Sequence, residues 1–165
     1  MSKVSVICRR VHDGDSIFVE DWTAKLGYWV RIAGIDAPEV FAPGYSSDQP
    51  FGREAGDAMR AELKGKSLEI DITGTDYWNR RLGNVYLDGV SVAIMAVRNG
   101  WAWAWPDTPH YKILKPLQDV SRLSKRGLWG LPGKKMRPAT WRNKNRGREA
   151  ADPMQWADEP LLPNR

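Results

Sequence analysis

The chain has 165 residues, of which 42% are hydrophobic and 27% charged, and its net charge is +5 at pH 7. This size and composition are typical of one globular domain. The single cysteine, Cys8, excludes an internal disulfide and a thiolate-rich zinc site. No run approaches the roughly 20 apolar residues that a membrane span needs, and the N-terminus does not resemble a secretory signal, so a cytoplasmic location is expected.

The positive charge is concentrated near the C-terminus. Seven of the 25 Lys and Arg residues lie within 134–148, a segment without Asp or Glu, which leaves 18 basic against 20 acidic residues elsewhere. Such a segment is commonly solvated, but it can also add salt-sensitive affinity for phosphates. We expect a folded domain over 1–132 and a partly disordered tail over 133–165, first basic and then acidic and proline-rich.

The first part of the chain is predicted to form strands. Alternating or β-rich runs predict strands over 4–9, 16–20 and 28–33, and Asp13-Gly14 is typical of a tight turn between the first two. Residues 40–50, which contain Pro, Gly and Ser without any period, predict a mobile loop.

Helices and strands alternate in the second part. Apolar residues four positions apart predict an amphipathic helix over 51–63. Two further strands are expected over 67–73 and 80–87, and two further helices over 92–98 and 111–125. The order predicts an α+β, mainly β fold: a five-stranded OB barrel with three helices.

Two carboxylates follow the third predicted strand. Asp36 and Glu39 flank Pro38, which keeps Ala37 extended. The Ala37 carbonyl then lies beside the Asp36 carboxylate, and such oxygen ligands suit a hard cation such as Ca²⁺. Taken alone, this segment could equally be an exposed acidic loop, and Asp15 an ordinary turn residue.

Two arginines complete a set that suits one reaction. Arg31 lies on an otherwise apolar strand, and Arg80 begins another, where a solvated surface arginine is the alternative. Phosphodiester hydrolysis needs a positioned water, a base and positive charge around phosphate. Asp15 and Asp36 would hold the metal, and Glu39 would orient or deprotonate the water. Both arginines would bind phosphate.

Four motifs resemble the staphylococcal nuclease (thermonuclease) family, in order and near its usual spacing. They are VHDGDSI at 11–17, VRIAGIDAPE at 30–39, FGREA at 51–55 and RGLW at 126–129. The resemblance covers about residues 3–130, and PATWR at 138–142 also resembles a segment that follows the domain in many bacterial members.

The resemblance implies an OB fold, calcium dependence, and cleavage of DNA and RNA at the 5′ P–O bond to leave 3′-phosphate ends. It implies that Asp15, Asp36 and the Ala37 carbonyl bind the metal. The catalytic residues it implies are Arg31, Glu39 and Arg80.

The chain departs from the family pattern around its second arginine. The usual order is Asp, any residue, Tyr, Gly, Arg, whereas residues 76–80 here are Asp, Tyr, Trp, Asn, Arg. Asn79 tolerates a positive φ better than most residues, so the turn can be retained. Arg81 follows directly, but the spacing to Asp76 favours Arg80 as the phosphate-binding residue.

Aromatic residues near loops are candidates for stacking on bases, namely Trp78, Trp105 and Tyr111, whereas Trp101 and Trp103 are better explained by packing. The expected partner is DNA or RNA, preferably single-stranded, and the protein is expected to act as a monomer away from membranes. A catalytically inactive OB module that binds single strands or a protein partner stays open as the alternative. The acidic cluster argues against an inactive nucleic-acid binder, which has no need of carboxylates beside phosphate.

Overall fold

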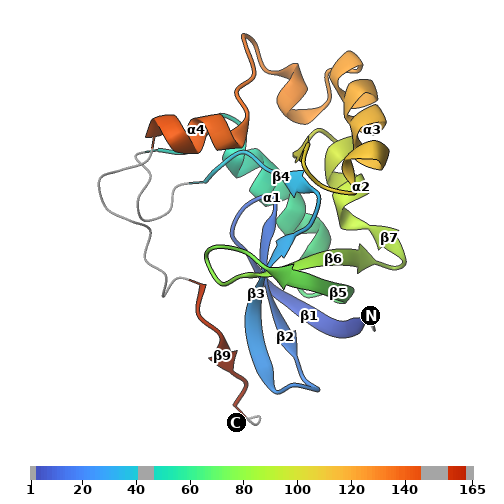
Figure 1. The fold of residues 1–165 in the computed structure, drawn as a ribbon, viewed down its shortest axis with the longest axis vertical. Coiled ribbons are helices and arrows are strands. Elements are labelled where there is room, and N and C mark those ends of the chain that lie inside the picture. The colour runs from blue at the N-terminus through green and yellow to red at the C-terminus, as the bar shows by residue number, and fades with distance from the viewer. Residues whose placement is uncertain (1–2, 41–46, 146–155, 163–165) are drawn as a thin grey trace.

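The computed structural model describes residues 3–40, 47–145 and 156–162 (Figure 1). Within these residues the long strands are β1 (Val4–Val11), β2 (Ser16–Asp21), β3 (Leu26–Ile32), β5 (Ser67–Thr75) and β6 (Arg81–Leu87). The short strands are β4 (Ile35–Asp36), β7 (Val90–Ser91), β8 (Trp103–Ala104) and β9 (Glu159–Pro160). The helices are α1 (Gly52–Leu63), α2 (Val92–Arg98), α3 (Tyr111–Leu123), the 3₁₀ helix η1 (Gly127–Gly130) and α4 (Pro138–Asn145). In the part of the chain described, none of these helices has the length and apolar character needed to cross a lipid bilayer.

The five long strands close into a barrel. β1 pairs antiparallel with β2 and with β5, β2 pairs with β3, and β5 pairs with β6. A parallel pairing of β3 with β6 completes the ring, with Arg31 opposite Leu82 and Ile32 opposite Gly83. This arrangement confirms the predicted OB barrel. It also brings Arg31, at the end of β3, close to the turn that precedes β6.

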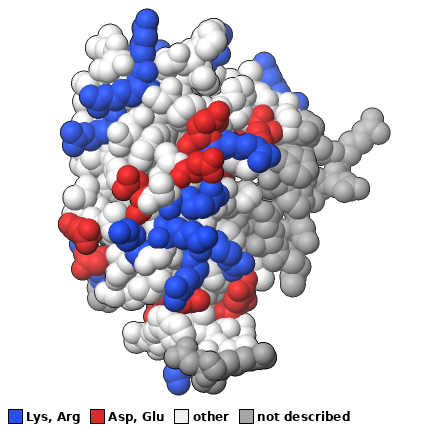
Figure 2. All heavy atoms as spheres, turned by 180° about the vertical axis from the view of Figure 1, so that it is seen from behind, with Lys and Arg blue, Asp and Glu red and all other residues white. Residues whose placement is uncertain are grey.

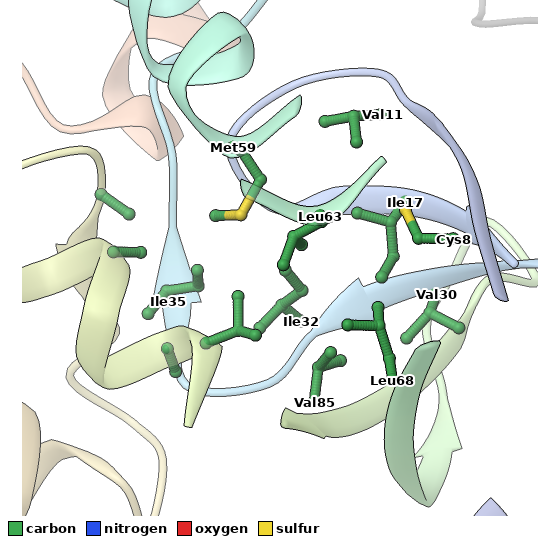
Figure 3. Close-up of a cluster of buried hydrophobic side chains, with 14 of the residues drawn as sticks. Cys8, Val11, Ile17, Val30, Ile32, Ile35, Met59, Leu63, Leu68 and Val85 are labelled. Carbon is green, nitrogen blue, oxygen red and sulfur yellow. The ribbon is translucent and has the colours of Figure 1, made fainter. Parts of the chain in front are cut away.

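The main hydrophobic core lies between the barrel and α1. Ala55, Met59 and Leu63, which recur at the four-residue spacing of one helix face, are fully buried. Met59 and Leu63 belong to the same cluster as Ile17 and Ile32 of the barrel strands (Figure 3). The predicted amphipathic helix is therefore confirmed, and its burial holds α1 against the end of the barrel from which the acidic residues come.

A tight turn at Gly34 sends the chain from β3 into β4. Gly34 has a φ of +85°, and a Cβ at this position would lie 2.7 Å from the Cβ of His110. Glycine is therefore required both by the backbone and by the close packing. β4 then pairs with β8, with Asp36 opposite Trp103. The turn thus returns Asp36 to the end of the barrel where Arg31 lies.

The C-terminal region contains elements that the sequence does not predict. The structure has a fourth helix, α4, beyond the three predicted; its polar sequence gives no apolar period, and its buried residue is Pro138. The predicted partly disordered tail also contains Trp156, which is buried, and β9, which pairs with β3. Parts of the predicted tail and of the predicted mobile loop lie outside the described residues: 146–155, 163–165 and 41–46.

Candidate active site

The turn between β1 and β2 places Asp15 at the end of the barrel. The backbone N–H of Asp15 donates to a carboxylate oxygen of Asp13 at 3.0 Å, which fixes the turn. At Gly14, a Cβ would lie 2.7 Å from the Cβ of Ala37, so this turn packs directly on the segment after β4. Asp15 and Ala37 are thereby neighbours, although β2, β3 and β4 lie between them in the sequence.

Asp15 is 3% exposed and its carboxylate is fully engaged. One oxygen accepts from the Ala37 N–H at 2.7 Å. The other accepts from the Ser16 hydroxyl at 3.0 Å and pairs with Arg31 at 2.6 Å. Burial raises the pKa of Asp15, but Arg31 and the Ala37 N–H outweigh burial and lower it to about 2. Asp15 is therefore ionised at every physiological pH.

Arg31 lies between two carboxylates. Its guanidinium pairs with Asp15 and, at 3.0 Å, with Asp36, and it donates to the Ile35 carbonyl at 3.2 Å. Its carbon Cζ also lies 5.0 Å from the ring centroid of Trp105. Burial lowers the pKa of Arg31, but the two carboxylates raise it by more, so the guanidinium stays charged. The β3 position thus delivers one fixed positive charge into an acidic site.

Glu39 and Asp36 share a second arginine that the sequence does not reveal. Arg142 of α4 pairs with Asp36 at 3.0 Å and forms a close ion pair with Glu39. Burial and the charge of Asp15 raise the pKa of Glu39 to about 7, in spite of Arg142. Burial likewise raises the pKa of Asp36. In both groups burial outweighs the neighbouring arginines and favours the protonated form.

Gln49 connects Glu39 to the C-terminal region. Its side-chain oxygen accepts from the Glu39 N–H at 3.1 Å, and its side-chain N–H donates to the Met136 carbonyl at 2.8 Å. The Gln49 N–H also donates to the Glu39 carbonyl at 2.8 Å. Because Gln49 is buried, this bridge holds Glu39 and the chain leading into α4 at a fixed separation.

Asp13 is a further carboxylate of the site, although the sequence indicates only a turn residue. It is 5% exposed, and burial, followed by the charges of Asp15 and Glu39, raises its pKa well above the ordinary value.

Figure 2 shows that charges of both signs share one face of the molecule, where Lys and Arg side chains gather across the middle with Asp and Glu side chains above and below.

Arg80 approaches Asp15 from the turn before β6. Its guanidinium donates to the Ser16 hydroxyl at 2.8 Å, and the same hydroxyl donates to Asp15. Asp76 pairs with Arg80 at 2.7 Å and accepts from its backbone N–H at 2.9 Å. Asn79 adopts a φ of 63°, so the altered turn keeps its shape. Arg81 pairs with Asp158 instead, and Arg80 is the arginine next to the carboxylates.

The three predicted stacking residues have different surroundings. Trp105 lines a pocket of about 540 Å³ together with Arg31, Asp76 and His110. Trp78 is half-buried against the cluster of Phe18, Trp29 and Trp156. Tyr111 packs partly buried against the main core, as Trp101 does, and Trp103 is buried against Trp129. Trp105 therefore has open space beside it.

The donor set at the site fits a hard cation. In the described ranges, no three Asp, Glu, His or Cys side chains form a complete metal site. Asp15 and Asp36 nevertheless pair with the same guanidinium, at 2.6 and 3.0 Å, so two carboxylates converge on one cation. A cation held by two carboxylates, a backbone carbonyl and water is an ordinary arrangement for calcium. Arg142 occupies one flank of this site, on Asp36.

The structure thus brings together all the predicted metal-binding and catalytic residues, which are Asp15, Arg31, Asp36, Ala37, Glu39 and Arg80. Sequence reasoning missed Asp13, Gln49 and Arg142. The one signal for Arg142 is its place in the PATWR segment, within a basic run that otherwise suggests a solvated tail.

Comparison with known proteins gives a consistent result. Residues 29–130 match the model of a family described as staphylococcal nuclease homologue. Over 136 residues the chain is 35% identical to an uncharacterised endonuclease of Escherichia coli O157:H7, covering 82% of each chain. Over 147 residues it is 27% identical to an uncharacterised endonuclease of Haemophilus influenzae, covering 88% of this chain and 78% of that protein. A staphylococcal-like nuclease of Arabidopsis thaliana is 29% identical over 118 residues, which are 72% of this chain and 34% of the plant protein.

Proposed function

Because the chain belongs to the staphylococcal nuclease family, we propose that it hydrolyses phosphodiester bonds of DNA or RNA. The observation that supports this function best is the buried mixture of charges around Asp15. Arginines alone would suit phosphate binding, whereas carboxylates alone would repel phosphate. Arg31 and Arg80 contact Asp15 directly and through Ser16, so both kinds of group converge at one point.

The reaction as proposed depends on calcium. The Asp15 and Asp36 carboxylates and the Ala37 carbonyl would hold the ion, which matches their oxygen-only chemistry. When bound, calcium would supply positive charge that stabilises the charge developing on the phosphate in the transition state. The two carboxylates already share one cation, the guanidinium of Arg31.

Glu39 is proposed as the base that takes a proton from the attacking water. A carboxylate with a pKa of about 7 accepts a proton at neutral pH more readily than an ordinary glutamate. Arg31 and Arg80 would bind the non-bridging phosphate oxygens, because a guanidinium presents paired donors and stays charged. The family resemblance implies that water attacks phosphorus and that the 5′ P–O bond breaks, which leaves a 3′-phosphate on one product and a 5′-hydroxyl on the other.

The pocket beside the site favours an unpaired nucleotide as substrate. It is lined by the Trp105 ring and by Arg31, with Asp76 and Asn84 supplying hydrogen-bonding groups. A base that is free of its partner strand can enter such a pocket and stack on the aromatic ring, whereas a paired base cannot. Single-stranded DNA or RNA is therefore the proposed substrate.

The direct test is cleavage of single-stranded DNA and of RNA with calcium and then with chelator. The Glu39→Gln variant should still bind these strands, but its turnover rate should fall by about 100-fold or more, as expected for loss of a general base. Glu62→Gln, an exposed carboxylate of α1, serves as the matched control with unchanged rate.

Two outcomes would contradict the proposal. Full activity of Glu39→Gln would remove Glu39 from the role of base. Calcium-independent binding without any cleavage, by wild-type protein shown to be folded, would instead favour the inactive binding module.

A further inference from the structure

The C-terminal segment 156–162 crosses the barrel beside the proposed active site and covers Arg80. Trp156 is 7% exposed. Its ring makes edge contacts with the rings of Trp29 and His12, at centroid distances of 4.9 and 5.2 Å. The guanidinium carbon of Arg80 lies 4.6 Å from the centre of the Trp156 ring. An aromatic ring thus lies against the guanidinium proposed to bind phosphate.

Two carboxylates of the same segment neutralise two further arginines. Asp158 forms a two-pronged ion pair with Arg81, at 2.7 and 3.0 Å. Glu159 pairs with Arg10 at 2.6 Å. The segment therefore places an aromatic ring against an arginine of the turn before β6, and one negative charge against each of two arginines at the start of β6 and in β1.

The surface under the segment has the composition of a single-strand binding site. Arg10 lies over the Phe18 ring at 3.8 Å, and Arg81 lies over the Tyr28 ring at 3.9 Å. Trp29 of β3 is buried beneath Trp156. Proteins bind single strands with cations that contact phosphates and with aromatic rings that stack on bases. Here an indole and two carboxylates, which resemble a base and two phosphates in aromatic character and charge, contact the three arginines.

The backbone attachment of the segment is slight. β9 contributes two paired residues, Glu159 opposite Gly27 and Pro160 opposite Leu26. A further hydrogen bond runs from the Leu161 N–H to the Lys25 carbonyl at 3.1 Å. Pro160 has no N–H to donate. The Arg10–Glu159 pair is about half exposed on both sides, and exposed ion pairs add little stability. A strand held in this way can be displaced.

We propose that the surface formed by Arg10, Arg80, Arg81, Phe18 and Trp29 binds a single-stranded polynucleotide, and that segment 156–162 occupies it as an internal competitor. This inference rests on the proposed function, which it extends by a second contact surface. Asp76 pairs with Arg80 and also lines the Trp105 pocket. Asp76 therefore links this surface to the pocket, and one strand can contact both.

The competing explanation is that the segment only braces the barrel by filling the cluster around Trp29. A measurement of binding affinity separates the two explanations. It is made in chelator, because without calcium the proposed nuclease does not degrade its ligand. The probe is a short fluorescein-labelled single-stranded DNA followed by anisotropy. The test variant carries Trp156→Ala, Asp158→Asn and Glu159→Gln. Its control carries Glu54→Gln and Glu62→Gln, which remove the same two charges from exposed positions of α1.

Competition predicts that the test variant binds about tenfold or more tightly than wild type, with a steeper dependence on salt as two more arginines meet phosphates. The control should show only the small gain due to net charge. Adding Arg10→Gln and Arg81→Gln to the test variant should abolish the gain. Unchanged affinity in the folded test variant, or a gain no larger than that of the control, would overturn the inference.

Folding and catalysis are read separately. If the triple variant melts below the assay temperature, Asp158→Asn with Glu159→Gln in a chain that keeps Trp156 gives the same comparison, and the same two outcomes apply.

Cleavage is then measured with calcium. Tighter binding without cleavage would overturn the proposed nuclease activity and support the binding surface. Cleavage at an unchanged affinity would support the nuclease activity and overturn the binding surface.

Discussion

At the scale of single residues, the charge balance of the site depends on Arg142. Its guanidinium is the one that Asp36 and Glu39 share, and its side chain is 21% exposed. Removing a cation from buried carboxylates is costly because the remaining charges lose their compensation. A divalent cation bound at Asp36, one of the proposed calcium ligands, would restore that compensation. Arg142 and calcium are therefore expected to substitute for each other in stabilising the fold.

The Arg142→Gln variant tests this substitution. In chelator its melting temperature should be lower than that of wild type. Its free energy of unfolding should be lower by roughly 1–3 kcal/mol once partial exposure is considered. In saturating calcium most of that loss should disappear. Thermal melts followed by tryptophan fluorescence measure both values, with Lys144→Gln, an exposed cation of the same helix, as control. An equal loss with and without calcium would show that Arg142 acts by packing alone.

The site residues that lie within short sequence motifs were predictable from the sequence. Asp15, Arg31, Asp36 and Glu39 lie within two motifs, and each residue type matches one chemical requirement of phosphate hydrolysis. Asp13 and Arg142 escape such reasoning for different reasons. An Asp before Gly is an ordinary turn residue, and nothing in the spacing shows that this one is buried. Arg142 reaches the site through tertiary packing across more than half of the chain.

At the scale of elements, the turn over residues 76–80 determines where Arg80 lies. Asp76 accepts from the backbone N–H groups of Trp78 and Arg80, both at 2.9 Å, and its other oxygen holds the Arg80 side chain. Asn79 completes the turn with a φ of 63°. Asparagine and glycine reach this region at little cost, whereas β-branched residues do so only with strain.

Asn79→Gly is therefore expected to preserve both stability and nuclease activity. Asn79→Val should lose roughly 1–2 kcal/mol of stability and should raise KM for single-stranded DNA, because the shifted turn moves Arg80. Asp88→Val is the matched control: Asp88 also has a positive φ, of 49°, in the turn between β6 and β7. It should lose similar stability with KM unchanged. A rise in KM shared by both valine variants would mean that general destabilisation, and not the position of Arg80, is responsible.

The elements themselves divide into those with a period and those without one. The long strands and α1 were predictable because apolar residues recur at the spacing of two or four. α4 shows no such period, since its contribution is an ion pair and a buried proline. β9 has two residues, one of them proline, and its pairing with β3 could be found only in three dimensions.

At the scale of the whole molecule, the barrel and the site are coupled through the core. Strand order was predictable from local patterns, but closure was not, because the parallel pairing of β3 with β6 joins segments about 50 residues apart. Opening the barrel would separate Arg31 from the turn that carries Arg80. It would also expose Cys8, which is fully buried in the main core (Figure 3).

Cys8 offers a measurement of this coupling. Burial raises the pKa of its thiol to about 12, and only a thiolate reacts readily with disulfide reagents. In the folded protein at pH 8 the thiol should therefore react far more slowly than in urea. Calcium that binds only the folded protein should slow the reaction further, by a factor of about ten when its concentration is ten times Kd. Asp15→Asn, which keeps the size of the side chain and removes its charge, should react at a rate that calcium does not change. If calcium protected Cys8 equally in that variant, the ion would be stabilising the barrel from a site other than Asp15.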